Sequence, residues 1–213
     1  MYKRFIVVVL VVFIVSIGFV YNSLAEGQNI LINGEFEEWD DTDVIVGDWK
    51  EGGDNIKKML LPYEWGIWGW GDRKKDTTVY EADSEVYHSG TYSARIEGVS
   101  QVVSQAAYTN TPVIEENISY KLSGWIKTEL EGGQHATINA ILRVGNTTKT
   151  QYNTKHITGV NDWTYSEIII TLKDMEDVTS MYIYCAVNGS NEKGKAWFDD
   201  IKLEEIEDST NSL

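Results

Sequence analysis

The sequence has a single cysteine, Cys185, so neither a disulfide framework nor a zinc site built from several thiolates can form within one chain. Cys185 lies in a strand-like run from Met181 to Val187, where we expect a small core residue. Basic residues are also few, because 18 Lys and Arg stand against 33 Asp and Glu, for a formal net charge of −15. Such a protein repels phosphate backbones, so we expect no nucleic acid partner; a neutral ligand, a cation or simple solubility suits this charge.

Several patterns of known enzyme chemistry are missing from the sequence. The three histidines, His88, His135 and His156, are far apart and form no H-x-x-x-H pair, which argues against a zinc hydrolase. The chain has neither the G-x-S-x-G turn of a serine hydrolase nor a glycine-rich phosphate loop. His88 opens the sequence His-Ser-Gly, where a structural hydrogen bond is the expected role. These absences favour a protein that is not an enzyme.

One acidic pattern keeps an enzymatic alternative open. Glu81, Asp83 and Glu85 have the spacing E-x-D-x-E, which places alternate residues on one face of a strand. The pattern resembles the catalytic strand of family 16 glycoside hydrolases, whose carboxylates act as nucleophile, helper and acid. The apolar residues that flank the motif in that family are absent here, and acids are abundant in this chain. A small glycoside hydrolase using these three residues is therefore kept only as an alternative.

Residues 1–25 have the composition of a secretory signal peptide. Two basic residues precede an apolar run from Phe5 to Val20, and small residues then predict cleavage between Ala25 and Glu26. The run is shorter than the ~20 residues that cross a bilayer, although an uncleaved anchor remains the alternative. Cleavage removes two of the 18 basic residues and moves the net charge from −15 to −17. We expect a secreted, extracellular protein with no membrane association after cleavage.

Residues 26–206 are predicted to form one all-β domain. Short runs rich in Val, Ile, Thr, Tyr and Trp are separated by Gly, Asn and Asp, and none shows a sustained helical period. Many short strands at regular spacing are typical of a sandwich or jelly roll. Without a repeat or a linker we expect a single domain and a monomer, with a loop over 40–60 and a disordered tail over 207–213. The predicted strands are 79–87, 92–99, 119–128, 136–144, 164–172, 181–187 and 195–206.

Three segments carry a family resemblance. Asn33-Gly34-Glu35-Phe36-Glu37 lies near the start of the soluble part, His88 to Ile96 lies in the middle, and Trp197 to Leu203 lies near the end. Together they resemble the carbohydrate-binding modules of the family 4/9/22 type, which are galactose-binding-like β-jelly rolls. The resemblance covers nearly the whole soluble chain and implies two antiparallel sheets. In such a sandwich the first and last strands commonly lie side by side, so we expect the two ends of the domain to meet.

The same resemblance implies a structural calcium ion (Ca²⁺). Its ligands would be the carboxylates of Glu37 and Asp199 and main-chain oxygens near Thr91 and Asn33. Calcium prefers six to eight oxygen ligands and accepts irregular geometry, which suits acids beside a turn. Period-two alternation places Asp199 on one face with Trp197, Ile201 and Leu203. On that pattern Asp200 faces solvent, together with Phe198 and Lys202.

The segment from Pro62 to Gly71 contains three tryptophans, Trp65, Trp68 and Trp70, interspersed with glycine. A flat indole packs against the C–H face of a sugar, and nearby polar side chains bind its hydroxyl groups. We therefore predict a sugar platform here, with a tryptophan-rich plug of the sandwich as the alternative. The other tryptophans that bear on the core, Trp49, Trp125, Trp163 and Trp197, are predicted to lie inside it.

Further ligand contacts are predicted on a strand pair. Tyr182 and Tyr184 occupy one face of a predicted strand and are expected to line a concave sheet. Arg143 and Gln151 are candidates for contacts with sugar hydroxyls. The leading hypothesis is a secreted, non-catalytic module that binds polysaccharide or oligosaccharide. An extracellular structural or protein-interaction sandwich without sugar binding is the second hypothesis.

Overall fold

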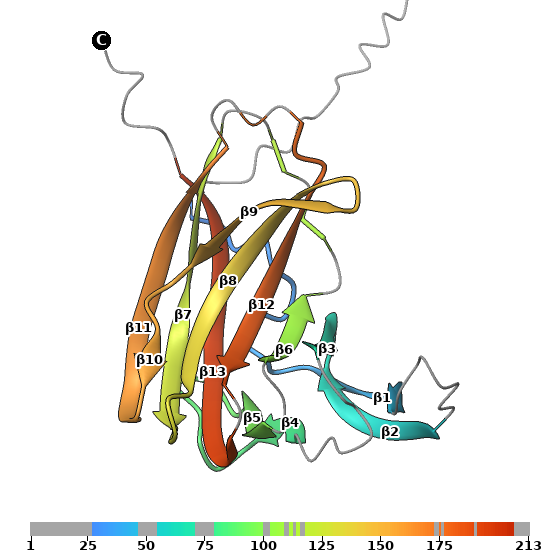
Figure 1. Ribbon diagram of the computed structural model, residues 1–213, viewed down its shortest axis with the longest axis vertical. Helices are drawn as coiled ribbons and strands as arrows, with labels where there is room; N and C mark the ends of the chain where they lie inside the picture. The colour runs from blue at the N-terminus through green and yellow to red at the C-terminus, as the bar shows by residue number, and fades with distance from the viewer. Residues whose placement is uncertain are drawn as a thin grey trace, which may run out of the picture.

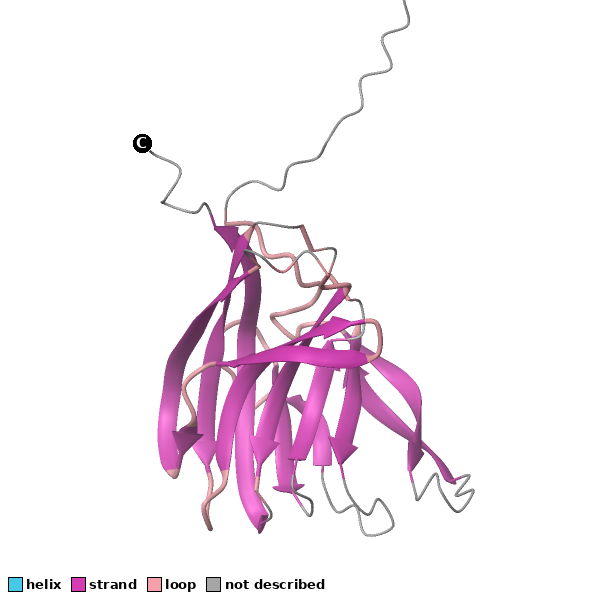
Figure 2. Ribbon diagram, turned by 45° about the horizontal axis from the view of Figure 1, so that its top comes forward, coloured by secondary structure: helices cyan, strands magenta, loops and turns pink. Residues whose placement is uncertain are grey.

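The computed structural model describes residues 27–46, 55–70, 79–99, 103–108, 111–112, 114–115, 118–172, 175, 177–189 and 191–206. At 42–46, 55–59, 68–70, 99, 103–108 and 191–192 it describes the backbone alone. This part of the chain is built from strands, turns and loops (Figure 2). Among its residues, no helix is long and apolar enough to cross a membrane. The predicted signal peptide and the predicted tail over 207–213 lie outside it.

Two antiparallel sheets form a sandwich, as predicted (Figure 1). The first, which we call the β8–β12 sheet, has the order β10-β8-β12-β6-β3, with β9 also paired to β8. Its strands are β3 (Trp65–Trp70), β6 (Val103–Tyr108), β8 (His135–Val144), β9 (Thr147–Asn153), β10 (Ile157–Thr158) and β12 (Ser180–Asn188). The second, the β7–β13 sheet, has the order β11-β7-β13-β5-β4. Its strands are β4 (Val79–Asp83), β5 (Ser93–Val99), β7 (Ser119–Glu129), β11 (Val160–Thr171) and β13 (Asn191–Ile206).

A two-stranded ribbon of β1 (Trp39–Val46) and β2 (Asn55–Pro62) projects beside β3, at the lower right of Figure 1. The expectation of a loop over 40–60 was wrong for 40–46 and 55–60, which are strands, and 47–54 lie outside the described residues. The Asp-rich sequence of β1 has low β-propensity. Its backbone is nevertheless paired along its whole length, from Trp39 opposite Pro62 to Val46 opposite Asn55. Pairing with β2 therefore holds a strand that its own composition does not predict.

The core lies between the inner faces of the two sheets. In β8 and β12 every second side chain enters it, and Cys185 is fully buried there, as predicted. Burial raises the pKa of its thiol well above the ordinary range. The residues of these two strands that enter the core are Ala136, Ile138, Ala140, Leu142, Met181, Ile183, Cys185 and Val187.

The two ends of the domain meet, as expected. The Ile30 N–H donates to the carbonyl of Leu203 at 2.8 Å, and the Ile201 N–H donates to the carbonyl of Gly34 at 2.8 Å. The Asn29 side chain binds both the carbonyl of Ile201 and the N–H of Leu203, at 3.0 Å each. The segment that opens the described chain thus runs along β13, which itself lies between β7 and β5.

A β-bulge in β13 overturns the predicted alternation. Asp199 is opposite Trp125 and Lys202 is opposite Ser123, so β13 has one more residue than β7 at this point. Asp200 has a φ of 49° at the bulge. Phe198 is consequently fully buried in the core and does not face solvent.

The bulge also changes the other positions of that pattern. Trp197 lies on the face away from the core, where its Nε1 donates to Asp83 Oδ2 at 2.8 Å. After the bulge, Ile201 and Leu203 return to the core and are fully buried. The four residues predicted to share one face are therefore divided between two faces, because one extra residue reverses a period-two pattern.

The contact between the first segment and β13 requires a residue without a Cβ at position 34. A Cβ on Gly34 would lie 2.0 Å from the Ile201 carbonyl oxygen, which is backbone and cannot move aside cheaply. We expect Gly34→Ala to lower the free energy of unfolding by about 2–4 kcal/mol, because the clash separates two hydrogen-bonded segments. Urea denaturation monitored by tryptophan fluorescence measures the loss.

Gly145→Ala is the control for this prediction. Position 145 has open space around it and a φ of +56°, so alanine there meets only backbone strain, worth ~1 kcal/mol. A Gly34→Ala loss no larger than that of Gly145→Ala would contradict the close approach of the two ends.

Candidate functional site

The β8–β12 sheet has a second face, which points away from the core and which we call the outer face. Successive residues of a strand point to opposite sides, so the residues between the buried ones in β8 and β12 belong to it. Across these two strands the outer-face residues pair directly, Tyr184 with Asn139, Tyr182 with Ile141, and Ser180 with Arg143.

Strand pairing extends the outer face to β9 on one side and to β6 and β3 on the other. In β9, Gln151 is paired with an outer-face residue of β8. On the other side, Trp68 is opposite Gln105, which is opposite Ala186 of β12. Directly paired residues lie on one face of a sheet, so position 68 belongs to the same face as Tyr182. Most of the predicted ligand contacts are thus brought to one surface.

The polar groups of the outer face gather around Arg143. Its guanidinium carbon lies 5.0 Å from the centre of the Tyr182 ring, in cation–π geometry. Its Nε is buried, and so is Oδ1 of Asn139, a residue that is 1% exposed. Neither atom has a hydrogen-bond partner in the described part of the chain. Unpaired buried polar atoms are costly, so this is a strained polar position beneath the half-buried Arg143 side chain.

The two predicted tyrosines differ in exposure. Tyr182 is half-buried, whereas Tyr184 is 4% exposed. Burial raises the pKa of the Tyr184 phenol, while the nearby Arg143 acts in the opposite direction. Tyr182 is therefore the tyrosine whose ring is available for stacking, and Tyr184 belongs to the floor of the surface.

The three clustered tryptophans divide between the two faces of β3. Trp65 is 3% exposed, its ring centre lies 4.9 Å from that of Phe36, and its Nε1 donates to the carbonyl of Asn33 at 3.2 Å. It is a core residue and not part of a sugar platform, because alternation along β3 turns position 65 inward. Positions 68 and 70 have the opposite parity; their side chains are outside the described part.

Two histidines that are distant in sequence meet at one end of the outer face. The rings of His135 and His156 are stacked, with centres 4.0 Å apart and an angle of 18°. Burial lowers the pKa of His135, and the charge of His156 lowers it further. His135 is therefore harder to protonate than a free imidazole. Their spacing in the sequence carries no signal of this contact, which arises because the segment after β9 returns to the start of β8.

Trp125 and Trp163 are not core residues, contrary to expectation. They lie on the side of the β7–β13 sheet away from the core and flank His88. The His88 ring is stacked on Trp125 at 3.9 Å and meets the edge of Trp163 at 5.6 Å. Trp197 is buried on the same side at 3% exposed, and Trp49 lies outside the described residues. The aromatic cluster supports the turn that begins at His88.

This turn, residues 88–92, is held by acids from both ends of the domain. Oδ2 of Asp199 accepts from the N–H groups of His88 at 2.7 Å and Ser89 at 3.1 Å. Oε1 of Glu37 accepts from the N–H groups of Thr91 at 2.8 Å and Tyr92 at 3.0 Å. The sequence thus predicts correctly that these segments meet, and four N–H donors satisfy the two carboxylates.

Gly90 allows that close approach. It has a φ of +65°, and a Cβ there would lie 2.2 Å from Glu37 Oε1. Asp200 completes the contact, because its carboxylate binds His88 Nδ1 at 2.7 Å and the Ser89 hydroxyl at 2.8 Å. The glycine of the His-Ser-Gly sequence is therefore required by both space and backbone conformation.

The predicted calcium ligands make hydrogen bonds with backbone and indole N–H groups in this arrangement. Thr91 presents its N–H to Glu37, and the carbonyl of Asn33 accepts from the Phe36 N–H and the Trp65 indole. Within the described ranges, no group of three or more His, Cys, Asp or Glu residues is arranged to hold a metal ion. Calcium stays a prediction, and Asp199 provides its test below.

The E-x-D-x-E pattern does not form a row of free carboxylates. β4 ends at Asp83, so Glu85 lies in the following bend, where its N–H donates to Asp83 Oδ1 at 2.9 Å. Oδ2 of Asp83 accepts from the Trp197 indole, and Glu81 forms an ion pair with Arg95. The three acids therefore cap a strand end and pair with neighbours in the β7–β13 sheet.

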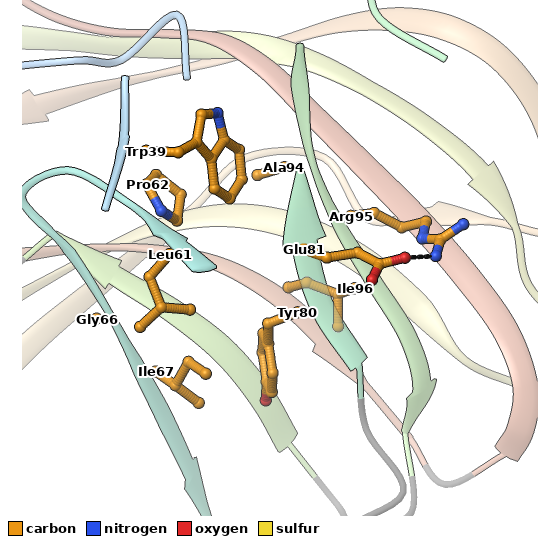
Figure 3. A pocket seen from close by; sticks show the side chains of 10 residues that line it. All are labelled: Trp39, Leu61, Pro62, Gly66, Ile67, Tyr80, Glu81, Ala94, Arg95 and Ile96. Atoms are coloured by element: carbon orange, nitrogen blue, oxygen red, sulfur yellow. Dashed lines mark ion pairs between the residues drawn. The ribbon is translucent and has the colours of Figure 1, made fainter. Parts of the chain in front are cut away.

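A small pocket lies where the ribbon meets the edge of the sandwich (Figure 3). Leu61 and Ile67 line one side, Tyr80 and Ile96 line the other, and the Glu81–Arg95 ion pair lies at the rim. Its lining is almost entirely apolar and offers few groups that bind hydroxyls. We attribute it to packing between the ribbon and the sandwich.

Comparisons with known proteins place this geometry in a family. The model of the family described as carbohydrate binding domain matches residues 28–191, and the chain belongs to that family. The CBM22-1 xylan-binding domain of Paenibacillus barcinonensis Xyn10C has the same fold, with a TM-score of 0.51 and 12% identity over 70% of this chain and 90% of that domain. These findings confirm the resemblance and the jelly-roll fold.

Two larger proteins contain a similar part. The tailspike protein 4 of bacteriophage CBA120 matches with a TM-score of 0.54 and 14% identity, over 84% of this chain and 21% of the tailspike. The tRNA(Glu)-specific nuclease WapA of Bacillus subtilis subsp. natto is 35% identical over 106 residues, which are 48% of this chain. The match covers only 4% of that nuclease.

Asp199 predicts a pH dependence of stability. Burial raises its pKa to about 6, against the opposing effect of the Ser89 and His88 N–H groups. Because this is above the ordinary value of 3.8, its contribution to stability is full below about pH 4 and is lost as the pH rises through about 6. In chelator, we expect the free energy of unfolding of the wild type relative to Asp199→Asn to fall by up to ~3 kcal/mol between these limits. Urea denaturation at a series of pH values measures it, and a flat difference would contradict the buried acid.

The same pair of proteins tests calcium. A cation held only by the folded state stabilises it. If Asp199 is a ligand, added calcium raises the melting midpoint of the wild type at pH 7 and leaves that of Asp199→Asn unchanged. Equal wild-type midpoints with and without calcium, once chelator has been shown to remove bound metal, would contradict the calcium prediction.

Proposed function

We propose that the protein is a secreted, non-catalytic module that binds polysaccharide on the outer face of the β8–β12 sheet. The observation that supports this best is the strand register. It brings Trp68, Tyr182, Arg143 and Gln151, which come from four strands, to one surface. Membership of the carbohydrate binding domain family gives that surface a ligand class.

The outer face combines the two contacts that a sugar needs. The half-buried ring of Tyr182 offers a flat surface for the C–H face of a pyranose, and the strand register places a tryptophan, Trp68, at a position of the same face. Arg143 offers a guanidinium beside the Tyr182 ring for contacts with hydroxyl groups. Binding of this kind positions a polymer without breaking it, which is why we infer no catalytic role.

Secretion rests on the sequence of residues 1–25, which lie outside the described part. The acids of the enzymatic alternative, Glu81 and Asp83, are engaged in an ion pair and an indole hydrogen bond. Neither observation concerns the outer face. The proposal that sugar binds to the outer face is therefore tested by binding experiments alone.

Tyr182→Ala and Trp68→Ala are expected to weaken polysaccharide binding about tenfold or more each, because loss of a central aromatic contact costs 1–3 kcal/mol. Affinity electrophoresis through gels containing xylan, β-glucan, mannan or pectic polysaccharides screens for the ligand, and calorimetry on the best one measures the dissociation constant. Xylan is included because the Paenibacillus domain of the same fold is described as xylan-binding.

Tyr165→Ala is the matched control. Tyr165 is 44% exposed and lies on the β7–β13 sheet, beside Trp125 and away from the outer face. Equal losses of affinity in Tyr165→Ala and Tyr182→Ala would contradict the assigned surface. Release of reducing ends from the bound polymer, abolished in Glu81→Gln, would support the hydrolase alternative in place of a binding module.

A further inference from the structure

Arg143 differs from the other arginine that the structure describes. The structure describes two arginines, and Arg95 contacts the carboxylates of Glu81, Asp83 and Glu97. Arg143 has no carboxylate within ion-pair distance in the described part of the chain, although the whole protein has 33 acidic residues. An unpaired guanidinium in so acidic a protein indicates that its partner is supplied from outside.

The outer face is free of acids as a whole. Across β9, β8, β12, β6 and β3, no position that the pairing assigns to this face is Asp or Glu. The corresponding face of the β7–β13 sheet differs, since it carries Glu81, Glu97 and Glu204. The acidic residues are thus distributed unevenly among the strand positions. Asp177, in the turn before β12, is paired with Lys149 of β9, so its charge is compensated.

The position of Arg143 suits a carboxylate ligand. Its guanidinium is held over the Tyr182 ring, which restricts the side chain before any ligand arrives. A guanidinium binds a carboxylate through two parallel hydrogen bonds, and such charge-assisted bonds are about twice as strong as neutral ones. The half-buried Tyr182 ring lies beside this guanidinium. An acid group and the face of a neighbouring sugar ring can therefore be bound next to each other.

The net charge of −15 does not prevent this binding. Exposed charges farther apart than the Debye length, about 8 Å at physiological ionic strength, interact weakly. Repulsion from acids on the opposite sheet is therefore screened, whereas contact between Arg143 and a bound carboxylate is direct. The local composition of the outer face decides which ligand is accepted.

We propose that the polysaccharide bound by this face carries uronic acid residues, whose carboxylates pair with Arg143. The inference rests on the proposed function, because it assigns a ligand class to the same surface. It departs from the neutral ligand that the overall charge favours, and it makes Arg143 the residue that determines specificity.

The test compares acidic polymers with their own carboxyl-reduced forms, which keep the backbone and lose the charge. Polygalacturonate, glucuronoxylan and alginate are the probes. We expect the wild type to bind at least one acidic polymer about tenfold more tightly than its reduced form. Arg143→Gln should lose this preference, because its affinity falls more for the acidic polymer than for the reduced form, and Arg143→Lys should keep part of the preference, because a lysine retains the charge without the two-pronged geometry.

Lys202→Gln is the charge control. Lys202 is exposed in β13, in the other sheet, so its loss removes the same charge without touching the outer face. The preference should be unchanged in this variant. Melting midpoints within 2–3 °C of the wild type, of the order expected for an intact fold, exclude a folding defect as the cause of any loss.

The possible outcomes separate the two proposals. Equal affinity for acidic and reduced polymers, or a preference that survives in Arg143→Gln, overturns the inference. Binding only to neutral polymers, abolished in Tyr182→Ala, also overturns it and leaves the proposed function intact. Failure to bind any polysaccharide would overturn both.

Discussion

The inner faces of the two sheets pack against each other so closely that Ile138, Ile183, Phe198 and Leu203 have no exposed surface. This burial removes every second residue of the central strands from any role in recognition. The face of each sheet that points away from the core remains available, and hydrogen-bonded strand pairing determines which side chains lie next to one another there. Residues from β3, β9 and β12, up to about 120 positions apart in sequence, become neighbours because their strands share a register with β8 and β6.

Strand alternation explains both what could be predicted and what could not. The run that became β7 alternates with period two, and the runs that became β8 and β12 are short and rich in β-branched and aromatic residues, so the strands, the core position of Cys185 and the shared face of Tyr182 and Tyr184 could be predicted from the sequence. β13 does not keep its period, because the bulge at Asp199 and Asp200 inserts one residue. No pattern in the sequence predicts the bulge. Because of the bulge, Phe198 and not Trp197 enters the core.

Strand alternation also determines on which side of its sheet each tryptophan position lies. Three indoles within six residues indicate a platform, but alternation in β3 sends position 65 inward and positions 68 and 70 outward. The prediction for Trp125 was wrong in the opposite sense. It was expected in the core, but it lies on the side of its sheet away from the core and is stacked on His88. Composition locates an aromatic residue in a strand; only the pairing partner tells which of two opposite faces it occupies.

The two ends of the domain are joined by the same turn that the family motifs identify. Glu37 from the first segment and Asp199 from the last strand bind neighbouring N–H groups of residues 88–92, so each motif is explained by contact with the other two. This cluster lies in the β7–β13 half of the sandwich, whereas Arg143 and its acid-free surroundings lie on the outer face of the β8–β12 sheet. The acids that hold the turn thus lie on one sheet and Arg143 on the other. Under the proposal made above, this separation would let a strongly acidic protein offer Arg143 to an acidic ligand without competition from the acids of the turn.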